Sequence, residues 1–285
     1  MPISSVRRCL AIIVMLGSLV IAPKPAEAQS KFGPLFDKFN FQVEGSWVDL
    51  STEIRLDSEL LGRGTTLNFE SELGLASSKT IPTLAFQWQI ARKHRVGVRW
   101  QDIKRSSNAQ ALNDIQWGDE VIPIEAEISL GFDLTQAFVD YAYYPWVKER
   151  WAAGFGLGLR WMDLQATLAW DSEGPTGEGS TDAVGSGPLP YLYFEYRRLF
   201  SDHWRFMTGL GWLSVKIGDI DGTQWVGHVG IEYLVGKRWS FGAGLNLATI
   251  DVDWEGVQTR SEESLLTAAI SMDVNDVSLF ARVRF

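Results

Sequence analysis

The sequence contains three histidines, and one of them stands near residue types that could perform acid–base chemistry. His228 precedes Glu232 by four residues, so both would project from the same face of an extended strand. A histidine beside a carboxylate can act as a general base. Asp219 and Asp221 lie a few residues earlier and would complete a candidate hydrolytic site at the rim of a fold. The alternative is a plain hydrogen bond, since no serine or aspartate directly flanks His228.

Other reactive constellations are absent from the sequence. Asp219-Ile220-Asp221-Gly222 looks like the start of a calcium loop but lacks the remaining ligands and the closing glutamate. No phosphate-binding glycine loop, zinc-ligand spacing or nucleophile elbow is present, and Cys9 is the sole cysteine. A net charge of −9 argues against nucleic acid as a partner. We therefore expect no enzyme activity, no metal and no cofactor, and keep a hydrolase of peptide or lipid as an alternative.

The elements that would position these residues are indicated by a period of two. Hydrophobic residues make up 46% of the chain, yet the mean hydropathy is −0.04, so apolar and polar positions must be interleaved. Phe155, Leu157, Leu159 and Trp161 alternate with glycines and Arg160, and comparable stretches recur from residue 40 to the end. Alternation predicts strands, and no run reaches the ~18 apolar residues of a membrane-spanning helix. We count ten strands, with eight or twelve as alternatives.

The connections between these stretches fall into two kinds that alternate along the chain. Four are short and basic, at 91–95, 147–150, 200–203 and 236–238. Five are longer and acidic, at 51–79, 105–124, 171–187, 219–223 and 255–264. Short turns at one end and long loops at the other are typical of an outer-membrane barrel. The acidic residues assigned to the three longest loops are Asp57, Glu59, Glu70, Glu72, Asp114, Asp119, Glu120, Asp171, Glu173, Glu178 and Asp182.

Aromatic residues gather at both ends of the predicted strands. An indole prefers the interface between lipid and water, so two groups separated by a strand length indicate two aromatic girdles. The sequence therefore predicts an all-β fold, a single closed antiparallel transmembrane β-barrel with short periplasmic turns and long extracellular loops. The group near the short turns is Tyr143, Tyr144, Trp146, Trp151, Trp204 and Trp239, and the group near the long loops is Trp47, Trp170, Trp212, Trp225 and Trp254.

The first residues have the pattern of a secretory signal peptide. Arg7 and Arg8 precede an apolar run over 10–22, and Ala26-Glu27-Ala28 supplies a small-x-small cleavage site. We expect residues 1–28 to be removed during export by the general secretory route. Residues 29–285 would then form the barrel domain.

The last strand carries a resemblance to a known class of proteins. Val277, Leu279, Ala281, Val283 and Phe285 occupy every second position up to the end of the chain. This pattern resembles the assembly signal of Gram-negative outer-membrane β-barrel proteins, with Ala281, Val283 and Phe285 as its last members. The resemblance implies a location in the outer membrane, contact with lipopolysaccharide, and insertion by the barrel-assembly machinery. We expect a monomer.

The parity that faces the lumen carries charges of both signs. Ten strands lie close to the eight at which side chains fill a barrel, and buried charges must be paired, so we expect ion pairs that largely plug the lumen. Since the first and last strands close the ring, Glu44 should lie near Arg282 or Arg284. The expected role is structural or surface-binding through the acidic loops, with a narrow channel as the alternative. The lumen set is Glu44, Arg99, Asp140, Arg160, Glu195, Arg197, His228, Glu232, Arg282 and Arg284.

Overall fold

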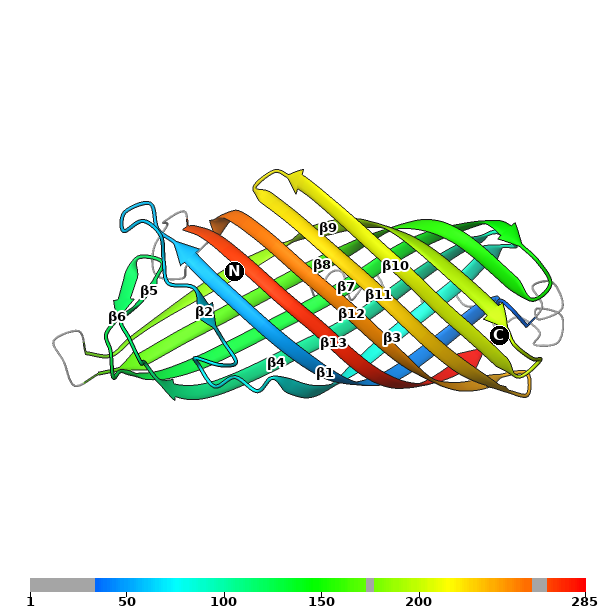
Figure 1. The fold of residues 1–285 in the computed structure, drawn as a ribbon, viewed down its shortest axis with the longest axis horizontal. Helices are drawn as coiled ribbons and strands as arrows, with labels where there is room; N and C mark the ends of the chain where they lie inside the picture. Colours follow the sequence, from blue (N-terminus) through cyan, green and yellow to red (C-terminus); the bar gives the residue numbers. More distant parts are fainter. Residues whose placement is uncertain (1–33, 173–176, 258–265) are drawn as a thin grey trace, which may run out of the picture.

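A computed structural model describes residues 34–172, 177–257 and 266–285 (Figure 1). Within these residues ten long strands form a ring in which chain neighbours pair antiparallel, and β13 pairs with β1 to close it. The described residues include no helix long and apolar enough to cross a membrane. The ring strands are β1 (Phe39–Asp57), β3 (Ser78–Ala91), β4 (His94–Gln110), β7 (Glu127–Val147), β8 (Trp151–Asp171), β9 (Gly179–Leu199), β10 (Trp204–Ile217), β11 (Ile220–Val235), β12 (Trp239–Val257) and β13 (Leu266–Arg284); β2 (Leu67–Asn68), β5 (Ile115–Trp117) and β6 (Glu120–Ile122) are short.

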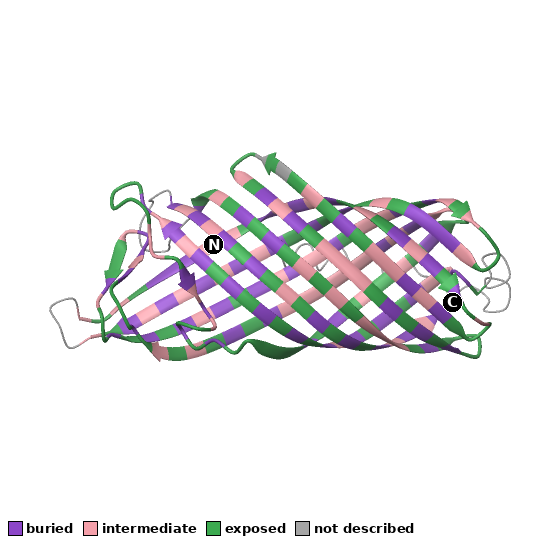
Figure 2. Cartoon of the chain, viewed as in Figure 1, coloured by how far each residue is buried: buried purple, intermediate pink, exposed green. Residues whose placement is uncertain are grey.

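Near the short turns, the strands alternate as predicted, with apolar residues outward and polar residues inward. On β13, Val277 and Leu279 are exposed on the outer face, while Ser278 and Arg282 are buried in the lumen. The outward apolar stretch runs on to Phe285, a length that suits the ~9–11 residues of a membrane-spanning strand. Figure 2 shows the alternation as a chequered pattern of buried and exposed residues along the barrel. We call this outward apolar zone the belt.

Toward the long-loop end, the same alternation continues with its polarity reversed. Beyond Trp47, β1 turns Asp49 and Glu53 outward, while Leu50 and Ile54 are buried inside. The expectation of loops over 51–79, 105–124 and 171–187 is therefore wrong in part, because β1 runs to Asp57, β4 to Gln110 and β8 to Asp171, and β9 starts at Gly179. The barrel extends well beyond the belt. Acidic outward residues gave this extension the composition of a loop.

The girdles follow from the same geometry, with three corrections. Tyr144, expected in the group near the short turns, is fully buried and packs inside the barrel against Phe36. Trp47, Trp161, Trp212 and Trp225 are exposed at the boundary between belt and extension, and Trp146, Trp204 and Trp239 are exposed near the short turns. Trp170 is instead buried inside the extension, and Trp254 packs against the apolar core there. Trp170 and Trp254 belong to strand segments beyond the belt, where the apolar parity faces inward.

Inward glycines make room for large side chains from neighbouring strands. A Cβ built on Gly158 would lie 2.2 Å from a ring carbon of Tyr191, and one on Gly156 would lie equally close to Tyr193. The ring of His228 covers Gly209 in the same way. Glycine opposite an aromatic residue thus fits bulky groups into a barrel of only ten strands.

The wall changes at a seam between β9 and β10. The ladder of these strands ends at the pair of Leu192 and Trp212, and beyond it β9 carries Pro188 and Pro190, which lack the N–H of a paired strand. Gln224 of β11 instead donates to the carbonyl of Pro190 at 3.1 Å. The hairpin of β10 and β11 turns at residues 218–219, a tighter turn than the loop expected over 219–223, and its tip stands apart in Figure 1.

The belt predicts a sharp difference between two positions on the same face of β13. Leu279→Arg places a cation against lipid and should lower the free energy of unfolding by about 2–4 kcal/mol, whereas Asn275→Arg, beyond the apolar stretch, should cost about 0–1 kcal/mol. Urea titration of protein refolded into lipid vesicles measures both. Equal losses for the two variants would contradict this placement of the belt.

Candidate functional site: the barrel lumen

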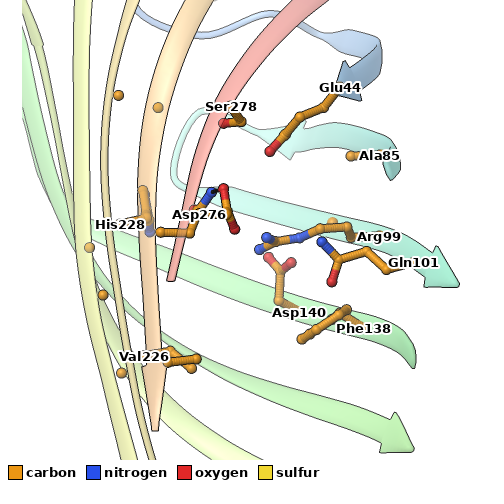
Figure 3. Close-up of a pocket in the computed structure, with 18 of the residues that line it drawn as sticks. Glu44, Ala85, Arg99, Gln101, Phe138, Asp140, Val226, His228, Asp276 and Ser278 are labelled. Carbon is orange, nitrogen blue, oxygen red and sulfur yellow. Dashed lines mark hydrogen bonds between the residues drawn. The ribbon is translucent and has the colours of Figure 1, made fainter. Parts of the chain in front are cut away.

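The lumen has three parts along its axis. Apolar side chains fill the long-loop end, an ion-paired network fills the short-turn end, and a cavity of about 220 Å³ lies between them. We call this space the mid-barrel cavity. Figure 3 shows labelled side chains of several strands, among them Glu44, Arg99, Asp140, His228 and Asp276, pointing into it.

The long-loop end is filled by connections that fold into the extension. Residues 58–77 bring Leu67, Phe69 and Leu73 into the lumen, where all three are buried. The ring of Phe69 lies 6.0 Å from that of Trp117 in the β5–β6 hairpin and 5.9 Å from that of Phe132 on β7. The long connections therefore pack as part of a hydrophobic core and do not simply extend into solvent.

Arg105 of β4 anchors this core and was not predicted as a lumen residue. Its guanidinium forms an ion pair with Glu70 of the folded connection and donates to the Thr52 hydroxyl at 2.8 Å. It also lies 4.8 Å from the centre of the Phe132 ring. Arg105 has the same parity as Arg95 and Arg99, so extending the predicted strand past residue 104 would have found it.

Arg205 organises the short-turn end and was also missed by sequence reasoning. It is fully buried, with Nε 2.8 Å from Glu232 and Nη2 2.7 Å from Asp37. It further donates to the carbonyl of Leu35 at 3.2 Å. The segment before β1 is thereby held inside the barrel, where Leu35 and Phe36 pack in an apolar cluster. This segment before β1 fills the short-turn end of the lumen. The alternating pattern could not predict it, because the pattern applies only to strands.

Two arginines predicted for the lumen join this network. Arg282 lies 3.0 Å from Glu232, and Arg284 lies 3.5 Å from Asp37. A neighbouring group links Arg197 and Arg95 to Glu195, with Arg95 also 3.2 Å from Asp140. The Tyr193 hydroxyl donates to Asp140 at 3.1 Å.

Glu44, expected near Arg282 or Arg284, is separated from Arg282 by one side chain. In the closing ladder it stands opposite Phe280, while Gln42 stands opposite Arg282. Arg282 donates to the Gln42 amide oxygen at 3.1 Å, and the Gln42 amide donates to Glu44 at 2.7 Å. The offset of one inward position therefore inserts Gln42 between Glu44 and the predicted arginine.

The candidate hydrolytic residues are not brought together. His228 lines the mid-barrel cavity, inside the belt, whereas Asp219 and Asp221 lie at the tip of the β10–β11 hairpin. Glu232 is engaged by Arg205 and Arg282 instead of by His228. The described residues also hold no group of three or more histidine, cysteine or acidic side chains placed to bind a metal ion.

Arg99 and Arg160 form a different arrangement around one aromatic ring. In register, Arg99 of β4 stands opposite Phe138 of β7, which stands opposite Arg160 of β8. The two guanidinium carbons lie 5.0 Å and 4.8 Å from the centre of the Phe138 ring. Phe138 thus holds two cations at one wall of the cavity.

The residues of the predicted assembly signal complete the ring. Phe285 accepts backbone hydrogen bonds from Lys38 at 3.0 Å and Phe39 at 3.2 Å, and its own N–H donates to Phe39 at 2.8 Å. Its side chain is exposed on the outer face, in line with Val283 and Ala281.

The network at the short-turn end predicts that Arg205→Gln strongly destabilises the barrel. The change leaves Asp37 and Glu232 with fewer partners, and breaking a buried ion pair costs about 3–5 kcal/mol. Arg150→Gln is the matched control, since its ion pair with Asp202 is exposed and such pairs contribute about 0–1 kcal/mol. Urea unfolding in lipid vesicles measures both, and a loss below that of the control would contradict the role of Arg205.

Comparisons with known proteins show similarity of fold. No family model and no curated protein matches the sequence. The outer-membrane protease OmpT from Escherichia coli is similar in structure, with a TM-score of 0.58, 9% identity, and coverage of 87% of this chain and 96% of that chain. Outer membrane protein OprG from Pseudomonas aeruginosa matches with a TM-score of 0.41, 9% identity, and coverage of 88% and 99%. The Pseudomonas putida toluene transporter TodX matches with a TM-score of 0.33, 10% identity, and coverage of 90% and 92%. The chain has the fold of Gram-negative outer-membrane β-barrel proteins, as the resemblance in its sequence implied.

Proposed function

We propose that the protein is a non-enzymatic, non-conducting barrel of the Gram-negative outer membrane that presents a binding surface on its extension. The observation that carries this proposal is the filling of the lumen at both ends. Arg205 is held among Asp37, Glu232 and backbone carbonyls at the short-turn end, and Phe69 and Trp117 are buried at the other. A channel would need a water path past both fillings, whereas a surface-binding protein needs a rigid support.

The binding surface lies on the connections above the apolar core. Backbone hydrogen bonds join the connection over 58–77 to the β5–β6 hairpin, with the Thr65 N–H donating to Gln116 at 2.9 Å. Exposed acidic residues stand next to exposed apolar ones in the chain, Glu59 before Leu60 and Glu120 before Val121. Ordered apolar groups exposed on a surface are typical of interaction sites. This set, which we call the rim patch, consists of Leu60, Leu61, Leu112, Val121 and Ile124.

The remaining parts of the proposal concern export and orientation. Residues 1–28, the proposed signal peptide, lie outside the described residues. The proposed orientation places the short turns in the periplasm and the extension outside the cell, as in barrels with this asymmetry. The protein would meet lipopolysaccharide around its belt, enter the membrane through the barrel-assembly machinery, and act as a monomer.

Electrical recording tests whether the lumen conducts. Purified protein, shown to be folded by its faster migration on a gel before boiling, is added to a planar lipid bilayer. We expect no stable conductance steps, because both ends of the lumen are filled. Stable steps that disappear in Arg99→Ala or Arg160→Ala would overturn the proposal in favour of the narrow channel.

A retention experiment tests the rim patch. Protein in lipid nanodiscs is passed over beads derivatised with octyl chains, and Leu60→Ser combined with Leu61→Ser should reduce the retained fraction several-fold, since it removes two exposed apolar groups. The matched control is Ser51→Ala, which changes an exposed polar side chain of the extension outside the patch. Equal retention of both variants would count against a binding role for these leucines.

A further inference from the structure

The arginines of the lumen divide into two groups. Arg95, Arg197, Arg205 and Arg282 each lie within ion-pair distance of a carboxylate. Arg99 and Arg160 line the mid-barrel cavity and form no ion pair or hydrogen bond within the part of the chain that the structure describes. Arg160 is only 5% exposed, and its Nε has no hydrogen-bond partner. Among the described residues, both guanidinium groups lie against the ring of Phe138.

The wall formed by β1 and β13 carries the complementary charge. Glu44 of β1 and Asp276 of β13 are buried there, and neither forms an ion pair among the described residues. Glu44 accepts hydrogen bonds from Gln42 at 2.7 Å and Ser46 at 3.2 Å. Asp276 accepts one from Asn246 at 2.8 Å. These neutral donors orient the carboxylates but leave their charges without a cation in ion-pair contact.

Buried cations and carboxylates that do not contact each other are unfavourable unless a ligand supplies the missing counter-charges. Buried charges are normally paired, and a buried arginine without an acid destabilises the fold. Arg95 and Arg197, in the same lumen, are both paired with Glu195. The lack of such pairs at Arg99 and Arg160 is therefore a local feature of the cavity. Perturbed or unpaired charges that surround a cavity are a mark of binding sites.

We propose that the mid-barrel cavity binds a small zwitterionic solute of the amino-acid class, which enters past one of the two fillings and opens no path through the whole lumen. Its carboxylate lies against Arg99 and Arg160, and its ammonium group lies against Glu44 and Asp276. Tyr191 and Gln136 also line the cavity and supply further polar groups. A volume of about 220 Å³ suits a solute of a few heavy atoms, and a zwitterion satisfies both walls without adding net charge.

Calorimetric titration of the full chain in detergent micelles tests the site. The probes are ω-amino acids from glycine to 6-aminohexanoate, each compared with the carboxylic acid and the amine of the same chain length. We expect at least one amino acid to bind tenfold or more tightly than both of its analogues. Binding of the acid as tightly as the amino acid, or binding of none of the probes, overturns the proposal.

Single variants test separately which group of the solute each wall of the cavity binds. Arg160→Gln should weaken the preferred amino acid at least tenfold, and Glu44→Gln should reduce its advantage over the plain acid by a similar factor. Arg150→Gln, in a short turn outside the cavity, should leave both unchanged. Unaltered binding in Arg160→Gln overturns the proposal even if an amino acid binds.

The melting temperature of the ligand-free protein distinguishes a ligand-binding arginine from one that only supports the fold. Without ligand, Arg160→Gln should melt at the same temperature as the parent chain or higher, because it removes an unpaired buried cation. The preferred amino acid should raise the melting temperature of the parent chain but not of this variant. A marked drop in the melting temperature of the empty variant would show that Arg160 supports the fold, and would overturn the assignment.

Discussion

Every backbone N–H and C=O group within the hydrocarbon of a membrane must find a partner inside the protein, and the rest of this structure depends on that constraint. The ring meets it by pairing β1 with β13 from Asn40 and Arg284 through to Asp57 and Thr267. Closure fixes the register of all ten strands. It thereby decides which side chains share a level in the lumen, including the opposition of Arg99, Phe138 and Arg160.

The two ends of the lumen are filled by different chemistry because their surroundings differ. Within the belt, lipid takes the apolar parity, so the lumen receives polar groups that pair around Arg205 and Glu232. Beyond Trp47, water surrounds the barrel, and burial of Leu50, Ile54 and the folded connection stabilises the extension as in a soluble protein. One continuous set of strands thus changes its stabilising interaction along its length. The mid-barrel cavity lies between the ion-paired part of the lumen and the apolar core of the extension.

Much of the fold within the belt could be predicted from the sequence. A period of two needs no tertiary information, and Val277 to Phe285 display it in full. Strand number, short turns and most aromatic positions follow from the same pattern. The extension was misjudged as loops because its acidic outward residues have the composition of a loop, although Val48, Leu50, Ile54 and Leu56 keep the period.

The site was predictable only in part, since parity places a residue in the lumen but does not say what it meets. Glu195 with Arg197 lies on one strand and could be paired from spacing, whereas Glu232 meets Arg205 across a hairpin. Asp37 comes from a segment with no periodicity at all. The lack of an ion-pair contact for Arg99 and Arg160 among the described residues is a property of the assembled ring and has no counterpart in the local sequence.

The reversal of polarity along long strands such as β1 also bears on how the chain avoids misfolding. A one-residue shift of a strand turns every side chain to the other face of the barrel. In a barrel without an extension, the shift would be unfavourable only where the strand crosses the membrane. Here a slip of β1 by one position would turn Glu44 toward lipid and, in the same movement, Leu50 toward water. The same slip is therefore opposed twice, by lipid within the belt and by water around the extension.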